Sequence, residues 1–521
     1  MPTTESPFAA TPPAFLGTPP VELGRPSGQT AAAITRLVID ELRRSAAHRA
    51  GRPLSATTSL ADAGIDEARF LDVVTRLEGR YQMRFHPEWL RGVRTAADLV
   101  ECIASRMFDA ADRAEAVARA AADRAASDAF PECAALEERL AGLEAAGLAN
   151  PFLLASEEVR GRTARIAGRD VVSFTSFDYL GLAGHPAVAE AAKRAIDRFG
   201  TSASASRMVG GNNSILEELD AELAAFTGCE RAVVFPCGYG TNASVFGHLC
   251  GPDDLILYDE LAHNSIQQGA AGSRAAKRPF RHNDYERLDG LLRDLRPNHR
   301  RVVVAIEGVY SMDGDYPDLP AFIEVKRRHD ALLYVDEAHS IGTMGPDGRG
   351  ICDFFGVDPA EGDLWMGTIS KALGSGGGYL AGPERLIRWL GCTTPSFVFS
   401  TACSPPNAAA ALEAIRVIGR EPWRVTRLRE RSELFLKCAI DAGLDTGTSG
   451  DTPVIPVILG SSARAMEVSQ RLLEQGINAR PILYPAVPER AARVRFFITC
   501  EHTEEQIVRA VEAIAETVAA T

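Results

Sequence analysis

From about Asn150 onward, short runs rich in β-branched and aromatic residues alternate with helical stretches. The clearest runs are AVVFP (232–236), LILYD (255–259), RVVVAIEG (301–308), ALLYVDEA (331–338) and GGYLAG (377–382). Parallel strands need crossover helices, and these cover both faces of the sheet. The alternation therefore predicts an α/β domain with a mostly parallel sheet. The strand candidates 452–459 and 493–500, with a closing helix from Thr503, predict a smaller α+β unit over about 422–521.

The first 149 residues differ from the rest in composition and in the spacing of apolar residues. Residues 1–30 are rich in Pro, Thr, Ser and Gly and predict a flexible tail. Apolar residues recur at helical spacing over 31–107, which predicts a small all-α bundle. Residues 108–149 are dominated by Ala, Arg and Glu and predict a helical linker to the α/β domain at 150–521.

Composition excludes several functional classes. A formal net charge of −13 argues against a nucleic-acid partner, which would need a concentrated basic face. The 10 cysteines contain no CxxC pair, so we expect neither a metal site nor a disulfide framework, and a reducing compartment fits them. The chain has no signal-peptide pattern at its start and no apolar run of about 18 residues. We therefore expect a cytoplasmic protein without a membrane span.

Two local patterns carry chemistry. Lys371 lies just beyond a strand-like stretch, in LWMGTISKALGSGGGYLAG (364–382), where it can reach a bound aldehyde; a lysine in such a loop is more often a solvated charge. Asp336 ends an apolar strand and His339 follows three residues later. A carboxylate at a strand end faces the ligand crevice of an open α/β sheet, where it can keep a pyridine nitrogen protonated. Alternatively, Asp336 caps a turn and His339 packs in the core.

The two patterns together, Asp-x-x-His and then Thr-x-Ser-Lys-Ala-Leu-Gly, are much harder to reach by chance. With them the chain resembles the α-oxoamine synthase family, pyridoxal-5′-phosphate (PLP) enzymes of fold type I. Further segments match in order: FDYLGLAGHP (177–186), SASRMVGG (204–211), FPCGYGTNASVFGHL (235–249), ELAHNSI (260–266), EGVYSMDGDYPDL (307–319), FVFSTACSPPN (397–407) and PAVPERAARVRFFITCEHT (485–503). The resemblance covers nearly all of 150–521 and implies a large sheet domain with a small C-terminal α+β domain.

The resemblance also implies roles for the cofactor site. Lys371 would form the Schiff base with PLP and shuttle the α-proton, His263 would stack on the pyridine ring, and Asp336 would pair with the ring nitrogen. The other implied cofactor contacts are Gly238, Tyr239 and Thr368 at the phosphate, Ser311 and His339 at the phenolic oxygen side, and Ser400 and Thr401 at the phosphate of the other subunit's cofactor. The last two contacts imply a homodimer.

On the substrate side, Arg495 matches the arginine that holds the amino-acid carboxylate, because a guanidinium offers a planar bidentate fork. Arg493 is the nearby competitor, and either arginine could instead be a surface charge on a strand. Asp178 stands where many relatives carry Asn, and Leu216 where many carry His. Both positions are expected to line the substrate side, so they leave the amino acid and the acyl group open.

The implied reaction joins an amino acid to an acyl thioester, carried by acyl carrier protein (ACP) or CoA, and yields an α-amino ketone, CO2 and free thiol. A fold type I aminotransferase or aldolase is the first alternative, and the segments EGVYSMDGD and PAVPERAARVRFF disfavour it. A non-catalytic partner subunit is the second alternative. The presence of Lys371, Asp336, His339 and His263 speaks against it.

The bundle at 31–107 resembles an acyl carrier protein over TTSLADAGIDEARFLDVVTRLEGRYQMRF (57–85). Carrier proteins bear phosphopantetheine on the serine of an Asp-Ser-Leu motif, and the corresponding residues here are Asp66, Glu67 and Ala68. Without a hydroxyl to modify, the bundle is predicted to be a degenerate carrier domain that serves docking or assembly. Its many arginines would suit an acidic partner carrier. An unrelated helical bundle is the alternative.

Overall fold

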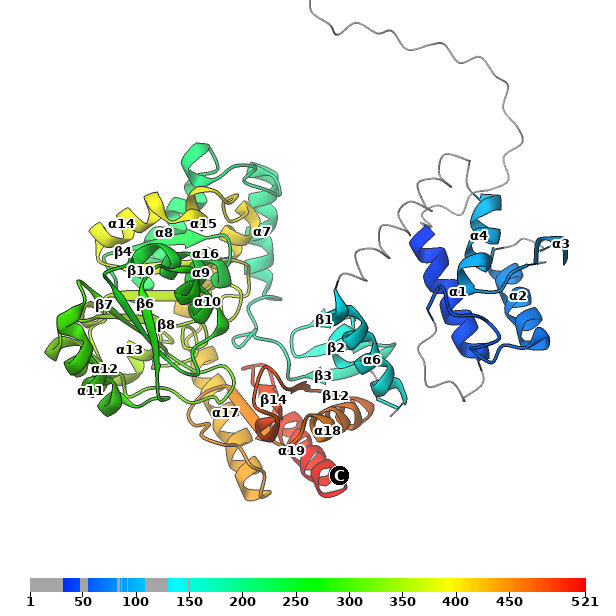
Figure 1. The fold of residues 1–521 in the computed structure, drawn as a ribbon. Helices are drawn as coiled ribbons and strands as arrows, with labels where there is room; N and C mark the ends of the chain where they lie inside the picture. Colours follow the sequence, from blue (N-terminus) through cyan, green and yellow to red (C-terminus); the bar gives the residue numbers. More distant parts are fainter. Residues whose placement is uncertain are drawn as a thin grey trace, which may run out of the picture. The chain divides into compact units, whose positions relative to one another are not determined.

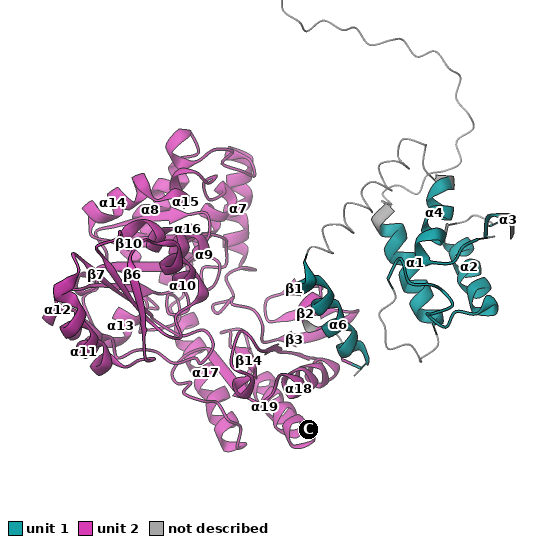
Figure 2. Cartoon of the chain, in the orientation of Figure 1, with its two compact units in different colours: residues 1–147 teal, residues 148–521 magenta. Residues whose placement is uncertain are grey.

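The computed structural model describes residues 31–46, 55–81, 85, 87–90, 92–107, 130–145, 147–148 and 150–521. Contacts divide the chain into two compact units, Met1–Gly147 and Leu148–Thr521 (Figure 2). The tail expected at 1–30 and the first part of the linker expected at 108–149 lie outside the described residues.

The described secondary structure of the first unit is helical, apart from turns and an isolated β-bridge between Ser59 and Thr95. Its helices are α1 (Ala31–Ser45), α2 (Glu67–Tyr81), α3 (Pro87–Leu90), α4 (Ala96–Met107) and α6 (Pro131–Ala145). Helix α1 packs against α2 and α4. Ile34, Val38 and Leu42 are four residues apart and fully buried, so they form one apolar stripe of α1. Asp66 accepts the backbone N–H of Arg69 and thereby caps the start of α2.

The second unit is built around a seven-stranded sheet in the order β4-β10-β9-β8-β7-β5-β6. The strands are β4 (Arg231–Phe235), β5 (Leu255–Asp259), β6 (Ala276–Phe280), β7 (Val302–Glu307), β8 (Leu332–Asp336), β9 (Leu364–Thr368) and β10 (Gly378–Gly382). All neighbouring pairs from β9 to β6 are parallel, and only β10 runs antiparallel to β9 and β4. The predicted mostly parallel α/β fold is confirmed.

Helices cover both faces of this sheet, as Figure 1 shows. One face carries α9 (Gly238–Leu249), α10 (Asn264–Gly272), α14 (Glu384–Thr393) and α15 (Pro395–Val398). The other face carries α8 (Ser214–Thr227), α11 (Tyr285–Leu295), α12 (Leu319–Arg328), α13 (Ile351–Phe355) and α16 (Pro405–Arg420). Helix α16 also packs on α7 (Pro186–Phe199). Alternate residues of β7 enter different apolar clusters: Val303 and Ala305 face α9 and α10, whereas Val304 and Ile306 face the opposite layer. This explains why the strands read as continuous apolar runs.

The C-terminal part adds a three-stranded sheet in the order β11-β14-β13, formed by β11 (Val454–Ile458), β13 (Arg480–Ile482) and β14 (Arg493–Phe497). Helices α17 (Trp423–Asp441), α18 (Ser462–Glu474) and α19 (Glu504–Ala519) pack around it, and Thr503 and Gln506 form a capping box at the start of α19. A four-stranded sheet that the sequence did not predict joins β1 (Ser156–Arg160), β2 (Thr163–Ile166) and β3 (Arg169–Ser173) to β12 (Ile477–Asn478).

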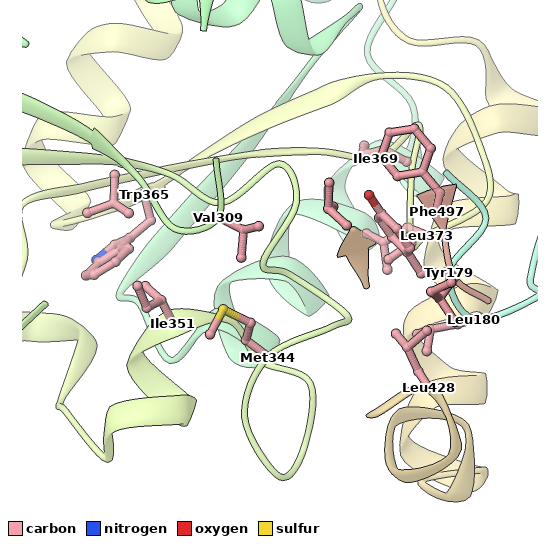
Figure 3. Packing of buried hydrophobic residues seen from close by; sticks show 14 of the residues in the cluster. Tyr179, Leu180, Val309, Met344, Ile351, Trp365, Ile369, Leu373, Leu428 and Phe497 are labelled. Atoms are coloured by element: carbon pink, nitrogen blue, oxygen red, sulfur yellow. The ribbon is translucent and has the colours of Figure 1, made fainter. Parts of the chain in front are cut away.

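One apolar cluster connects the large sheet to the C-terminal part of this unit. Figure 3 shows it running from Trp365 on β9, past Ile351 and Met344, to Leu428 on α17 and Phe497 on β14. The loops that carry the candidate site are therefore anchored on both sides by buried side chains. Within the described ranges, no helix combines the length and apolar character that crossing a membrane requires.

Candidate active site

Four side chains meet at one edge of the large sheet because parallel strands end there together. Asp259 ends β5, Glu307 ends β7, Asp336 ends β8 and Thr368 ends β9. The register places Glu307 directly opposite Asp336. All four residues are buried. The edge therefore concentrates carboxylates in a place that water barely reaches.

Lys371 follows β9 by three residues, and its Nζ lies 5.6 Å from the centroid of the Phe177 ring. Burial lowers the pKa of Lys371 to about 8, although the carboxylates of Asp336 and Glu307 oppose this shift. Such an amine is partly deprotonated near neutral pH. It can therefore act as a nucleophile or as a base.

The Asp336 carboxylate is held from both sides by N–H donors. Its Oδ2 accepts the side-chain amide N–H of Asn242 at 2.6 Å, and its Oδ1 accepts the backbone N–H of Ala338 at 2.9 Å. These contacts fix the carboxylate plane at the strand end. The carboxylate can still accept a further proton donor, because each oxygen has a second lone pair.

Two histidines occupy the same region. His339 Nδ1 lies 2.7 Å from the Tyr179 hydroxyl, and burial keeps the pKa of His339 well below its ordinary value, with Lys371 and Arg495 adding to the effect. His263 precedes α10, and its Nδ1 lies 2.7 Å from Ser265 Oγ. Burial lowers its pKa as well. Both rings are therefore neutral and retain one N–H and one acceptor nitrogen each.

The start of α9 forms a close-packed anion cradle. A Cβ placed on Gly238 would lie 2.8 Å from Thr368 Oγ1, so this position requires glycine. Thr368 Oγ1 also lies 2.7 Å from Ser370 Oγ. Backbone N–H groups at a helix start and clustered hydroxyls suit a phosphate. Tyr239 is half exposed and donates its hydroxyl to Asn264 Oδ1 at 2.9 Å.

The structure separates the two arginines of β14. Arg493 is bonded through two of its nitrogens: Nε donates to the Ala491 carbonyl, and Nη1 donates to the Met312 carbonyl and pairs with Asp313 at 2.6 Å. Arg495 donates from Nη1 to the Ser311 carbonyl at 2.5 Å, and its buried Nε finds no acceptor in the part of the chain that is described. Burial lowers the pKa of Arg495 to about 10. Arg495 is thus the arginine whose Nε–H is available to a ligand carboxylate.

The remaining predicted residues have other surroundings. Asp178 accepts the backbone N–H groups of Leu182 at 2.7 Å and Ala183 at 3.2 Å, and burial raises its pKa. Leu216 is fully buried in the core on α8, and its expected place on the substrate side stays a prediction. A substrate role for Asp178 stays a prediction, because its carboxylate already caps a turn.

Ser400 and Thr401 follow α15 in a segment at the surface of the unit, and neither side chain is hydrogen-bonded to any of the described residues. Among the described residues, no hydrogen bond or ion pair joins them to the Lys371 cluster. The nearby Ala402 N–H instead donates to the Ala205 carbonyl at 3.0 Å.

Sequence reasoning missed three residues of this region: Asn242, Ser265 and Glu307. Glu307 had a signal, because it ends an apolar strand just as Asp336 does. Its Oε1 accepts the His263 backbone N–H at 2.5 Å. Asn242 and Ser265 lie inside two of the matched segments, 235–249 and 260–266, but were given no role there. Their inward direction is decided by packing, so no local pattern identifies them.

Comparison with known proteins agrees with this geometry. The family model for class I and II aminotransferases matches residues 169–514. An 8-amino-7-oxononanoate synthase from Symbiobacterium thermophilum is 40% identical over 73% of this chain and 96% of its own length. The chain belongs to the α-oxoamine synthase family. Its members are PLP-dependent acyltransferases, and PLP is the cofactor.

Two further relatives support the assignment. A second 8-amino-7-oxononanoate synthase, from Thermoanaerobacter pseudethanolicus, is 38% identical over 73% of this chain and 95% of that protein. A solved serine palmitoyltransferase with PLP has a TM-score of 0.71 and 30% identity, and covers 74% of this chain and 97% of that one. The serine palmitoyltransferase of Sphingomonas wittichii gives a TM-score of 0.72 at 30% identity, and covers 76% and 98%. The family-model match does not reach the N-terminal unit.

The residues present fit PLP at three points. The Gly238 and Thr368 cradle suits the phosphate, the Asp336 carboxylate suits a protonated ring nitrogen, and the buried amine of Lys371 suits the aldehyde. Serine and histidine groups predicted at the ring also lie in this region: His263 and His339 through their side chains, and Ser311 through its carbonyl contact with Arg495.

Proposed function

We propose that residues 150–521 catalyse the decarboxylative condensation of an amino acid with an acyl thioester, giving an α-amino ketone, CO2 and free thiol. The observation that carries the proposal is the pairing of Lys371, an amine with a pKa lowered to about 8, with Arg495, a buried guanidinium whose Nε finds no acceptor among the described residues. The two cations are close enough for Arg495 to contribute to the lowered pKa of Lys371. One group holds a carboxylate while the other moves the proton on the neighbouring carbon.

Bound PLP supplies an aldehyde for the amino group and a ring that accepts the electron pair left at the α-carbon. Arg495 binds the amino-acid carboxylate through its free donors. The uncharged amine of Lys371 would take the α-proton. Asp336 would hold the ring nitrogen in its protonated form, and the neutral imidazole of His263 would adjoin the ring without adding a charge.

The second half of the reaction is the attack on the acyl thioester and the loss of CO2. The carbanionic α-carbon attacks the thioester carbonyl, the C–S bond breaks, and the thiol leaves with a proton. The carboxylate then departs as CO2, and its bonding electrons return to the α-carbon, which is reprotonated. The relatives, which are synthases of this kind, favour condensation over transamination.

The proposal is tested first by α-proton exchange in D2O, followed by NMR, with PLP-loaded protein and a panel of glycine, L-alanine, L-serine and further amino acids. Exchange that depends on Lys371 supports α-carbon activation. Adding acyl-CoA or acyl carrier protein should then release thiol and the amino ketone. Formation of a keto acid without any thioester would instead identify an aminotransferase.

We also propose that the enzyme is a homodimer in which Ser400 and Thr401 reach the partner's cofactor phosphate. The segment that carries them exposes Phe399 at 84%, and the adjoining 3-10 turn at Arg207–Val209 exposes Val209 at 80%. The Ala402 to Ala205 hydrogen bond joins these segments. Large exposed apolar side chains on adjoining segments suit an interface.

A complementation experiment tests this arrangement. Lys371→Ala chains and chains with Ser400→Ala and Thr401→Ala would each be inactive or weak alone. In a mixed dimer, one site would combine an intact Lys371 with intact Ser400 and Thr401 from the other subunit. Recovery of activity on mixing supports a shared site, and no recovery in a proven mixed dimer contradicts it.

For the N-terminal unit we propose a degenerate carrier domain that docks a partner carrier protein bearing the acyl group. Helix α2 begins at Glu67, and Asp66 caps it. Glu67 therefore stands at the position at which a carrier protein needs serine. Incubation with a phosphopantetheinyl transferase and CoA should leave the intact mass unchanged. A mass increase by phosphopantetheine would overturn this proposal. We also propose a cytoplasmic location, supported by 10 free cysteines.

A further inference from the structure

Asn242 is an almost fully buried amide, 1% exposed, on the second turn of α9. Its Oδ1 accepts the Tyr334 hydroxyl at 2.7 Å. Its Nδ2 donates to Asp336 Oδ2 at 2.6 Å and to Ser265 Oγ at 2.9 Å. One side chain therefore contacts both the acid expected at the ring nitrogen and the serine that holds His263.

The directions of these hydrogen bonds are fixed by chemistry. A flipped amide would turn its oxygen toward the Asp336 carboxylate, where two acceptors would repel each other. In the orientation with Nδ2 toward Asp336, the amide donates one hydrogen to Asp336 and the other to Ser265. It leaves Oδ1 as the acceptor for Tyr334.

The chain of donors continues to His263. Because Ser265 Oγ accepts a hydrogen from Asn242, its own hydrogen is available for His263 Nδ1 at 2.7 Å. The Ser265 backbone N–H also approaches Nδ1, at 3.3 Å. With both groups donating, Nδ1 is the acceptor and the ring proton resides on Nε2.

We propose that Asn242 is a positioning residue that ties the orientation of Asp336 to the tautomer of His263, so that the two groups facing the cofactor ring are set together. This inference rests on the proposed PLP site and adds a residue to it. Asn242 acts through Asp336 and Ser265. Tyr334, in turn, holds Asn242 in the one rotamer that serves both.

The test uses PLP-loaded full-length protein and two readouts besides turnover: the PLP dissociation constant, and the pH midpoint of the visible cofactor absorbance. Asn242→Ala removes a charge-assisted hydrogen bond to Asp336 and the support of Ser265. We expect PLP affinity to fall about tenfold or more and the midpoint to move by about one pH unit. A change in packing alone would not move that midpoint.

Asn478→Ala is the matched control. Asn478 is also a buried amide, 4% exposed, and it donates to the hydroxyls of Ser173, at the end of β3, and Thr175. No hydrogen bond among the described residues joins its side chain to Asp336 or His263. Its loss should lower stability but leave both readouts at wild-type values.

Two milder variants guard against misfolding of Asn242→Ala. Tyr334→Phe removes only the donor to Oδ1 and keeps the ring that packs on Phe246, and Ser265→Ala cuts only the branch to His263. Both should move the readouts in the same direction by smaller amounts.

The outcomes separate the two levels of the argument. If wild-type protein with PLP shows no visible absorbance band that is lost in Lys371→Ala, the proposed cofactor site is wrong, and this inference fails with it. A normal wild-type band, with the Asn242, Tyr334 and Ser265 variants all indistinguishable from it, would overturn this inference alone. A shift in Asn478→Ala as large as that in Asn242→Ala would also overturn it.

Discussion

Replacing each arginine of β14 by methionine should separate substrate binding from structure. Arg495→Met removes the guanidinium whose Nε has no acceptor in the described protein, whereas Arg493→Met removes one that is bonded to two carbonyls and to Asp313. Methionine keeps much of the volume and loses every donor. The first variant should therefore lose substrate affinity, and the second should lose stability.

The magnitudes follow from the bonds at stake. Two hydrogen bonds from Arg495 to a carboxylate, each worth about 1.5 to 3 kcal/mol, give roughly a 10²- to 10⁴-fold loss in kcat/KM for the amino acid. Arg495→Lys keeps the charge without the planar fork and should recover only part of this loss. Arg493→Met should lower the free energy of unfolding by about 3 kcal/mol, because it leaves Asp313 unpaired. The 21% exposure of the Asp313 side chain keeps this cost at the low end.

The assay combines steady-state kinetics in the amino acid, at saturating acyl donor, with denaturant unfolding of the same preparations. The amino acid is chosen from the D2O exchange panel. Our assignment would be refuted if Arg495→Met stayed within about twofold of wild type in kcat/KM while Arg493→Met lost a hundredfold or more. That pattern would make Arg493 the carboxylate ligand in spite of its ion pair with Asp313.

Three further predictions concern the cofactor groups. Lys371→Ala should abolish both turnover and the visible cofactor absorbance, and substantial residual turnover would remove Lys371 from its role. Asp336→Asn should reduce kcat by orders of magnitude with the protein still folded, because a neutral ring is a poorer electron sink; a mild effect would contradict that role. In the apo-protein the Lys371 pKa is lowered from 10.5 to about 8, so between these values the unfolded chain binds more protons than the native state. Relative to Lys371→Met, the wild-type unfolding free energy should therefore rise by about 1.5 kcal/mol from pH 8 to 9.5, and a flat difference would mean that the amine is solvated.

The sequence predicts the large sheet well because its strands are covered on both faces. Val303 and Val304 point to opposite layers, yet both are buried, so the run is apolar throughout and easy to identify. Strand β1 was missed for the opposite reason. All of Ser156–Arg160 is exposed, and that strand holds its place through pairing with β2. A strand defined by its partner leaves little pattern in its own residues.

The same distinction applies to the candidate site. Asp336 and Lys371 were identified because each belongs to a local motif that follows a strand. The family resemblance favoured Arg495, but the strand pattern alone could not separate it from Arg493, since both lie on the same strand and point to the same face. The choice depends on the loop at Ser311 to Asp313, which pairs the Arg493 guanidinium with a carboxylate and gives Arg495 only a carbonyl, while the buried Nε of Arg495 finds no acceptor among the described residues.

The site is arranged so that its incompletely paired groups match the parts of its ligands. A buried charge without a full partner costs stability, and that cost is recovered when an opposite charge binds. Arg495 needs a carboxylate, Asp336 can accept a protonated ring nitrogen, and the start of α9 suits a phosphate. Neutral donors such as Asn242 hold Asp336 without neutralising it, so its charge stays available to the cofactor. PLP should therefore raise the unfolding free energy of the wild type more than that of Asp336→Asn, and an amino-acid ligand should add a second increment that Arg495→Met lacks.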